Sequence, residues 1–212
     1  MILVLTGAPG AGKGTQAELL VERMGFRTLS TGDALRRQIK LGSEVGKLAE
    51  AVMADGKLVP NEILLDILKA ELGDVSEGSV LLDGYPRNLA QAETLKTLSS
   101  QYPVGAVLHL DVDEDILTGR LCGRRVCGSC GSSFHMEFNP PAVEGECDKC
   151  QGQLQQRPDD VEEKVKVRLG VYSSETKPIL DFYRNEGIYM RVNGNGSTED
   201  VFKRLSQTVD AL

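Results

Sequence analysis

The sequence has no apolar run long enough to cross a membrane, which argues against a membrane-spanning helix. Its apolar start, MILVLTGAPG, lacks the basic residues of a secretory signal, so we expect a buried strand there and a cytoplasmic protein. An excess of basic residues is also missing, because 24 Lys and Arg stand against 31 Asp and Glu, for a net charge of −7. This balance argues against a broad nucleic-acid or anionic-membrane surface, so any anion site has to be local.

Short apolar segments alternate with segments of helical periodicity along the 212 residues. Strands are expected at 1–6, 27–30, 79–83, 104–110 and 188–192. Helices are expected at 16–24, 33–55 with a break near 41–43, 61–72, 88–99, 113–121, from 161 with an interruption at Pro178, and 198–212. The alternation predicts a three-layer α/β fold with a parallel five-stranded sheet. Residues 124–157, rich in Gly, Pro, Cys and Gln, break this rhythm as an insertion.

A glycine-rich stretch, GAPGAGKGT, lies between the first predicted strand and the first predicted helix. Its glycines let backbone N–H groups turn inward around a phosphate chain, and the helix N-terminus adds partial positive charge. Lys13 can reach the β and γ phosphates. The usual pattern has Ser or Thr immediately after the lysine, but here Gly14 intervenes and the hydroxyl is on Thr15. A plain strand-to-helix turn with an exposed lysine is the alternative, but spacing and context favour phosphate binding.

Asp83 ends the apolar run SVLLD, so it is expected at the carboxyl edge of a parallel strand near the phosphate loop. A carboxylate there can hold Mg²⁺ directly or through water, although an aspartate before Gly84 is also a common turn residue. The glutamate base that many ATPases carry after this aspartate is missing, as is an NKxD guanine-reading motif. These absences disfavour an AAA-like ATPase and a small GTPase.

Four cysteines, Cys127, Cys130, Cys147 and Cys150, form the pattern C-x2-C-x16-C-x2-C. Four thiolates at this spacing can close a tetrahedron around Zn²⁺, which leaves no position for substrate and therefore indicates a structural site. Two disulfides, a redox CxxC pair and an iron site are the alternatives, and a reducing compartment argues against the disulfides. We expect Cys122 to be a small buried residue outside the site, His135 to be no ligand, and His109 to be a core histidine.

Five motifs occur in order, GAPGAGKGTQA, LSTGDALR, GKLVP, LLDGYPRN and RPDD, and together they resemble the adenylate kinase family over essentially the whole chain. The cysteines make the resemblance closest to its long-lid, zinc-containing bacterial type. The resemblance implies a P-loop nucleoside monophosphate kinase fold, with a helical AMP-binding insertion at 31–60 and a zinc-ribbon-like lid at 123–160. The core would comprise 1–30, 61–122 and 161–212.

The resemblance also implies the reaction and its residues. Family members transfer the terminal phosphoryl group of Mg-ATP to AMP, giving two ADP. Implied ATP contacts are Gly10, Ala11, Gly12, Lys13, Gly14, Thr15, Arg120, Arg124, Ser133, Phe134 and Gly196. Implied AMP contacts are Thr31, Arg36, Lys57, Leu58, Val59, Gly84, Tyr85, Pro86, Arg87, Gln91, Arg157 and Arg168. The expected catalytic cations are Lys13, Arg87, Arg120, Arg124, Arg157 and Arg168, because guanidinium groups hold phosphate oxygens bidentately. We expect a monomer.

Three positions depart from the common family pattern: Ala34, Asn193 and Gly196. Ala34 replaces a larger apolar residue near the AMP base, and the other two lie in the turn expected at the ATP adenine. Two rival functions stay open from the sequence. One is another nucleoside monophosphate kinase, for UMP, CMP or GMP. The other is a non-catalytic zinc-ribbon module that binds nucleotide and a macromolecular partner, which the acidic charge and the arginine set disfavour.

Overall fold

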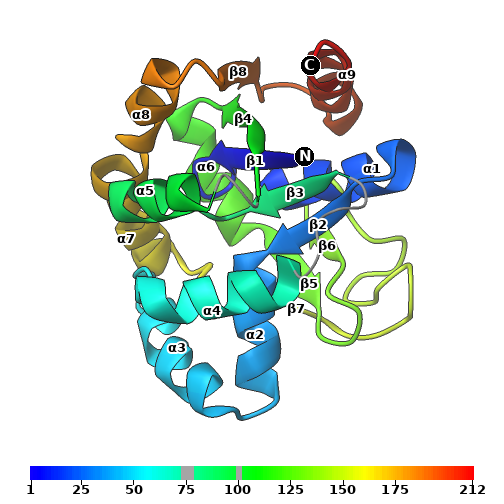
Figure 1. The fold of residues 1–212 in the computed structure, drawn as a ribbon. Coiled ribbons are helices and arrows are strands. Elements are labelled where there is room, and N and C mark those ends of the chain that lie inside the picture. Colours follow the sequence, from blue (N-terminus) through cyan, green and yellow to red (C-terminus); the bar gives the residue numbers. More distant parts are fainter. Residues whose placement is uncertain (73–78, 99–101) are drawn as a thin grey trace.

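A parallel sheet of five strands forms the centre of the molecule in a computed structural model that describes residues 1–72, 79–98 and 102–212 (Figure 1). The strands are β1 (Ile2–Gly7), β2 (Arg27–Ser30), β3 (Val80–Asp83), β4 (Val104–Asp111) and β8 (Tyr189–Asn193), in the order β2-β3-β1-β4-β8. Every neighbouring pair is parallel. The predicted fold class is therefore confirmed, and each predicted strand forms within a residue or two of its expected bounds.

Alternate residues of β1 face opposite sides of the sheet, as the period of a strand requires. Ile2 and Val4 pack into one apolar core with α4 (Asn61–Leu72), α5 (Leu89–Thr97) and α8 (Ile179–Asn185). Leu3 and Leu5 pack into a second core with α1 (Lys13–Met24), α6 (Glu114–Cys122) and α9 (Thr198–Asp210). Figure 1 shows α5 and α8 on one side of the sheet and α1 and α9 on the other, which gives the three expected layers. Residue 99, the expected end of the helix at 88–99, lies outside the described residues.

Two further helices, α2 (Thr31–Lys40) and α3 (Glu44–Ala54), follow β2 and break where the sequence predicted, at 41–43. Ser30 caps α2 by accepting a hydrogen bond from the Asp33 N–H, and Ser43 caps α3 in the same way. The two helices pack closely because Gly46 has no side chain. A Cβ atom there would lie 2.2 Å from the carbonyl oxygen of Gln38.

The helix that begins after residue 161 changes geometry before Pro178. It runs as α7 (Glu162–Val171), continues as a π-helix, η1 (Tyr172–Thr176), and resumes as α8 directly after the proline. The Lys177 N–H donates to the Tyr172 carbonyl five residues earlier, at 2.8 Å, which is the π pattern. The predicted interruption therefore exists, but it starts six residues upstream of Pro178.

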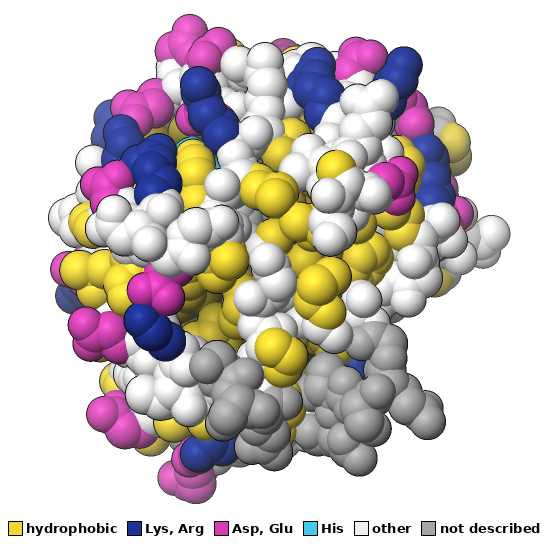
Figure 2. Space-filling model, turned by 45° about the horizontal axis from the view of Figure 1, so that its top comes forward, with side chains coloured by type: hydrophobic (Ala, Val, Ile, Leu, Met, Phe, Trp, Pro, Cys, Tyr) yellow, Lys and Arg dark blue, Asp and Glu magenta, His cyan; other side chains and the backbone are white. Residues whose placement is uncertain are grey.

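The insertion at 124–157 forms a separate antiparallel sheet of β5 (Arg124–Cys127), β6 (Ser133–His135) and β7 (Leu154–Gln155), in the order β6-β5-β7. Its buried apolar cluster is small and consists of Cys127, Phe134, Cys147 and Leu154. The described helices include none that is both long and apolar enough to span a bilayer. On the face in Figure 2, the Lys and Arg side chains that are drawn alternate with Asp and Glu around a more hydrophobic middle.

Candidate functional site

One cleft of about 810 Å³ opens at the carboxyl edge of the central sheet, between α2–α3 and the β5–β7 sheet. It is lined by nearly every residue that the sequence assigned to nucleotide binding: Gly10, Ala11, Gly12, Lys13, Gly14, Thr15, Thr31, Arg36, Lys57, Leu58, Val59, Asp83, Gly84, Pro86, Arg87, Arg120, Arg124, Ser133, Phe134, Arg157, Arg168 and Gly196. Tyr85 and Gln91 are buried behind its wall instead. The sequence motifs, up to 186 residues apart, therefore meet around one space.

The phosphate loop turns tightly because Gly10 and Gly12 adopt positive φ angles of 87° and 93°. Its lysine, Lys13, donates to the carbonyls of Gly7 at 2.8 Å and Ala8 at 3.0 Å. Desolvation in the cleft lowers the pKa of Lys13 to about 8, while the charge of Asp83 acts in the opposite direction. A lysine with this pKa keeps its charge at neutral pH, where it can hold phosphate oxygens.

Asp83 ends β3 beside this lysine, and burial raises its pKa while the charges of Lys13 and Arg87 lower it. A desolvated carboxylate next to a phosphate loop is a suitable oxygen ligand for Mg²⁺, so the donor set fits the ion that the sequence predicted. Direct or water-mediated coordination by Asp83 stays a prediction.

The segment after Asp83 places Arg87. Gly84 has φ +81°, and a Cβ atom there would lie 2.7 Å from an Arg87 nitrogen, so glycine is required. The Gly84 carbonyl accepts hydrogen bonds from Arg87 Nε at 2.8 Å and Thr31 Oγ1 at 2.9 Å. Gln91 Oε1 accepts from the Arg87 backbone N–H at 2.7 Å, and Gln91 Nε2 is buried without a hydrogen-bond partner. The predicted adenine-reading role of Gln91 stays a prediction.

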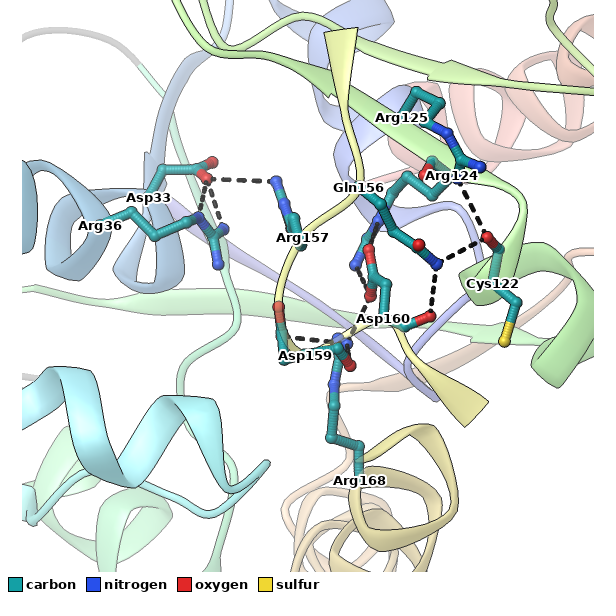
Figure 3. A network of polar contacts seen from close by, with 10 residues as sticks. All are labelled: Asp33, Arg36, Cys122, Arg124, Arg125, Gln156, Arg157, Asp159, Asp160 and Arg168. Atoms are coloured by element: carbon teal, nitrogen blue, oxygen red, sulfur yellow. Dashed lines mark hydrogen bonds and ion pairs between the residues drawn. The ribbon is translucent and has the colours of Figure 1, made fainter. Parts of the chain in front are cut away.

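A fully buried carboxylate, Asp160, joins two arginines of the cleft (Figure 3). Arg124 of β5 donates to both of its oxygens, at 2.7 and 2.6 Å, and Arg168 of α7 donates to one of them at 2.7 Å. Arg168 also pairs with Asp159 at 3.0 Å. Gln156 donates to the backbone carbonyls of Asp160 and Cys122, both at 3.0 Å, and so ties the two ends of the insertion together.

A second carboxylate, Asp33, pairs with the arginines on the other side of the cleft (Figure 3). Arg36 Nε donates to it at 3.2 Å, and Arg157 lies 3.8 Å from the same oxygen. Burial would raise the pKa of Asp33, but the charge and hydrogen bond of Arg36 outweigh this and lower it. Burial lowers the pKa of Arg157 to about 9, because Arg36 and Arg124 add repulsion in a desolvated place. The cleft therefore concentrates positive charge that is only partly neutralised by its own carboxylates.

The four predicted metal ligands converge. The Sγ atoms of Cys127, Cys130, Cys147 and Cys150 all lie within 4.8 Å of one another, and the closest cross-pairs are 3.4 and 3.6 Å apart. Four thiolates about 2.3 Å from a central Zn²⁺ would be about 3.8 Å apart, so the cluster fits a tetrahedral zinc site. All five cysteines are free thiols, as the zinc interpretation expects and the disulfide alternative does not. Cys122 lies outside the cluster, as expected, but it is half-buried, so the expectation that it is a small buried residue was wrong.

The two histidines also have defined places. His109 contacts the hydroxyl of Tyr189 through Nδ1 at 2.9 Å and that of Tyr172 through Nε2 at 3.1 Å, and burial lowers its pKa to about 4. It is therefore the core histidine that was predicted, with both ring nitrogens in contact with hydroxyl groups. His135 accepts the backbone N–H groups of Glu137 and Phe138 on Nδ1 and lies outside the thiol cluster.

Comparison with known proteins assigns the chain to a family. The family model for adenylate kinase matches residues 5–188. The chain belongs to the adenylate kinase family. It is similar to the adenylate kinase of Thermodesulfovibrio yellowstonii, at 47% identity over 97% of both chains. It is also similar to those of Geobacillus sp. WCH70 (46%, all of both chains) and Bacillus subtilis 168 (45%, 100% of this chain and 99% of the relative). The four-cysteine cluster fits the zinc-lid type of this family.

Several residues of the cleft were not assigned by the sequence. Phe138, 66% exposed, lines the cleft with its ring 5.9 Å from the Arg120 guanidinium carbon. Thr176 and Tyr172, both in η1, line it as well. A lone phenylalanine or threonine carries no motif, so only the fold identifies these positions as part of an adenylate-kinase-type cleft. The monomeric state stays a prediction.

Proposed function

We propose that this chain catalyses reversible phosphoryl transfer from Mg-ATP to AMP, giving two ADP. The single observation that carries the proposal is the convergence of Lys13 with Arg87, Arg124, Arg157 and Arg168 on one cleft in a member of the adenylate kinase family. Two phosphate chains brought end to end are strongly anionic, and five cations from separate elements offset that repulsion.

The reaction breaks the bond between the γ phosphorus and the bridging β–γ oxygen of ATP and forms a bond between that phosphorus and an AMP phosphate oxygen. The chain's contribution is positioning and charge stabilisation, and no side chain is needed as a nucleophile. Lys13 and the phosphate loop would hold ATP, while Arg87 and Arg36 would hold the phosphate of AMP. Mg²⁺, held through Asp83, would neutralise charge on the ATP phosphates when bound.

The two insertions divide the substrates in this proposal. Residues 31–60 form the AMP side, 123–160 form a lid over ATP, and 1–30, 61–122 and 161–212 form the core. Arg124 and Arg157 belong to the lid, so closure would deliver both guanidinium groups and exclude water from the phosphates. Zinc in the four-thiol cluster would keep the lid folded and would take no part in the transfer.

A substrate panel tests the proposal. Purified protein is assayed with Mg-ATP and each of AMP, UMP, CMP and GMP in a coupled assay for ADP, alongside zinc analysis. We expect turnover with AMP and about one zinc per chain. A clear preference for UMP, CMP or GMP would overturn the AMP assignment, and absence of turnover with all four would favour a non-catalytic nucleotide-binding module.

A further inference from the structure

The backbone of Arg87 is held from both sides by side chains of other elements. Its N–H donates to Gln91 Oε1 at 2.7 Å, and its carbonyl accepts from Thr176 Oγ1, also at 2.7 Å. The N–H belongs to the peptide group before Arg87 and the carbonyl to the one after it. Together, these two bonds therefore fix both backbone dihedral angles from which the Arg87 side chain starts.

The Thr176 bond is the longer-range of the two, since it joins residues 89 positions apart. Thr176 is only 6% exposed and belongs to the lining of the cleft. A short, partly buried hydrogen bond between a π-helix and a loop that no regular structure supports constrains the loop locally. The Arg87 guanidinium is then fixed at its other end by Nε donating to the Gly84 carbonyl at 2.8 Å.

The π-helix explains how Thr176 reaches Arg87. One π turn takes an extra residue, which rotates everything after it by about 100° relative to a continuous α-helix. The start of η1 is anchored on the sheet, because Tyr172 contacts His109 of β4 at 3.1 Å. Its last residue, Thr176, is anchored on Arg87. The segment thus spans from the central sheet to the loop that carries the arginine.

We propose that Thr176 is a positioning residue for Arg87, and that it sets the affinity for the acceptor nucleotide by orienting the guanidinium that receives its phosphate. The inference rests on the proposed function, in which Arg87 binds the phosphate of the nucleoside monophosphate. Thr176 itself need not touch the substrate.

The test compares Thr176→Val, which keeps the shape and removes the hydroxyl, with Thr176→Ser, which keeps the hydroxyl. We expect Thr176→Val to raise both KM and the calorimetric Kd for AMP by about three- to tenfold, the range that one lost hydrogen bond gives. KM for ATP should change by less than about twofold, because in the proposed function Arg87 binds the acceptor phosphate and the lost hydrogen bond acts only through Arg87. Thr176→Ser should restore the AMP constants. Ser174→Ala is the matched control, because Ser174 is an exposed residue of the same π-helix whose hydroxyl donates to the carbonyls of Gly170 and Val171 in the preceding α7, and not to Arg87.

A double-mutant cycle separates positioning from direct contact. In an Arg87→Lys background, Thr176→Val should have almost no further effect on AMP affinity, since its action runs through Arg87. The inference is overturned if AMP affinity is unchanged in Thr176→Val, if ATP and AMP constants shift equally, or if the effect persists in the Arg87→Lys background. Should Thr176→Val lose its cooperative melting, Thr176→Ala carries the same comparison.

Failure of the proposed function would look different. If the unaltered protein prefers another nucleoside monophosphate, that acceptor replaces AMP in the same comparison, and the positioning role is still decided. If no acceptor is phosphorylated, the calorimetric Kd for AMP alone decides it: a rise that Thr176→Ser reverses supports the role, and an unchanged or undetectable affinity contradicts it.

Discussion

The helical insertion proposed at residues 31–60 and the lid proposed at residues 123–160 border the same cleft, but different forces hold them folded. Leu35, Ala49 and Val59 of the helical insertion belong to the large apolar core that also contains the sheet. The lid has its own cluster of only four residues, two of them cysteines. An apolar cluster that small cannot offset the chain entropy of about 38 residues, so we expect the lid, unlike the helical insertion, to depend on a metal at its four clustered thiols.

The largest expected effect comes from a variant that tests whether the lid depends on its thiol cluster. Cys147→Ser removes one of the four clustered thiols, on a residue that is 1% exposed. We therefore expect the loss of zinc, proteolysis within 123–160, and a fall in turnover of about a hundredfold or more as the lid arginines lose their geometry. The five-stranded core should stay folded, because its two apolar clusters contain no lid residue in the part of the chain that the structure describes.

Cys122→Ser is the control for this prediction, because Cys122 is a free thiol outside the cluster. It should keep zinc and turnover. A metal-free variant whose lid stayed protease-resistant and whose stability was unchanged, but which lost phosphoryl transfer in a single turnover, would falsify the structural role of zinc.

The next prediction concerns the ion pairs of Asp160, which connect the lid to the core. Asp160→Asn removes the charge that faces Arg124 and Arg168 from a position that is fully buried. We expect a loss of about 3 kcal/mol in the free energy of unfolding, because two partly buried cations lose a fully buried counterion, and Arg168 keeps only its pair with Asp159. Denaturant titration measures this. Asp159→Asn, which removes only the ion pair with Arg168, should cost clearly less, and equal losses for the two variants would contradict the central role of Asp160.

Local sequence patterns could be predicted from the sequence, whereas contacts between distant residues could not. The phosphate loop, the sheet and the four cysteines are local patterns in which each residue type has one dominant physical use, and all of them were found. Asp160 and Thr176 could not be assigned their contacts, because their partners lie 36 and 89 residues away and only the fold brings them together. The lid strands were missed because they are two to four residues long, too short for apolar alternation to indicate a strand.

The helical insertion can be loosened without touching the cleft. Gly46→Ala places a methyl group 2.2 Å from the Gln38 carbonyl oxygen, so α2 and α3 have to separate. We expect a loss of about 1–3 kcal/mol in unfolding free energy, typical of overpacking, and a higher KM for AMP. Gly170→Ala is the matched control, since nothing lies within 4 Å of a Cβ atom there. It should stabilise α7 by up to about 1 kcal/mol, and a gain at Gly46 as well would show that α2 and α3 are not tightly packed.

The smallest expected effect concerns how the lid touches the core. Lys149 of the lid lies 3.3 Å from Glu18 of α1, and both side chains are more than half exposed. An exposed ion pair contributes little and is screened by salt, so Glu18→Gln should change kcat and the KM for ATP by less than about threefold at low ionic strength. The change should vanish near 0.5 M salt, and its direction should be a higher KM for ATP, because the lost ion pair joins the proposed lid to the core. Glu162→Gln removes an exposed ion pair within α7 and should leave both constants unchanged. A large effect of Glu18→Gln that persists in high salt would contradict this prediction. It would mean that the ion pair with Lys149 holds the lid on the core, in addition to the metal that is expected to keep the lid folded.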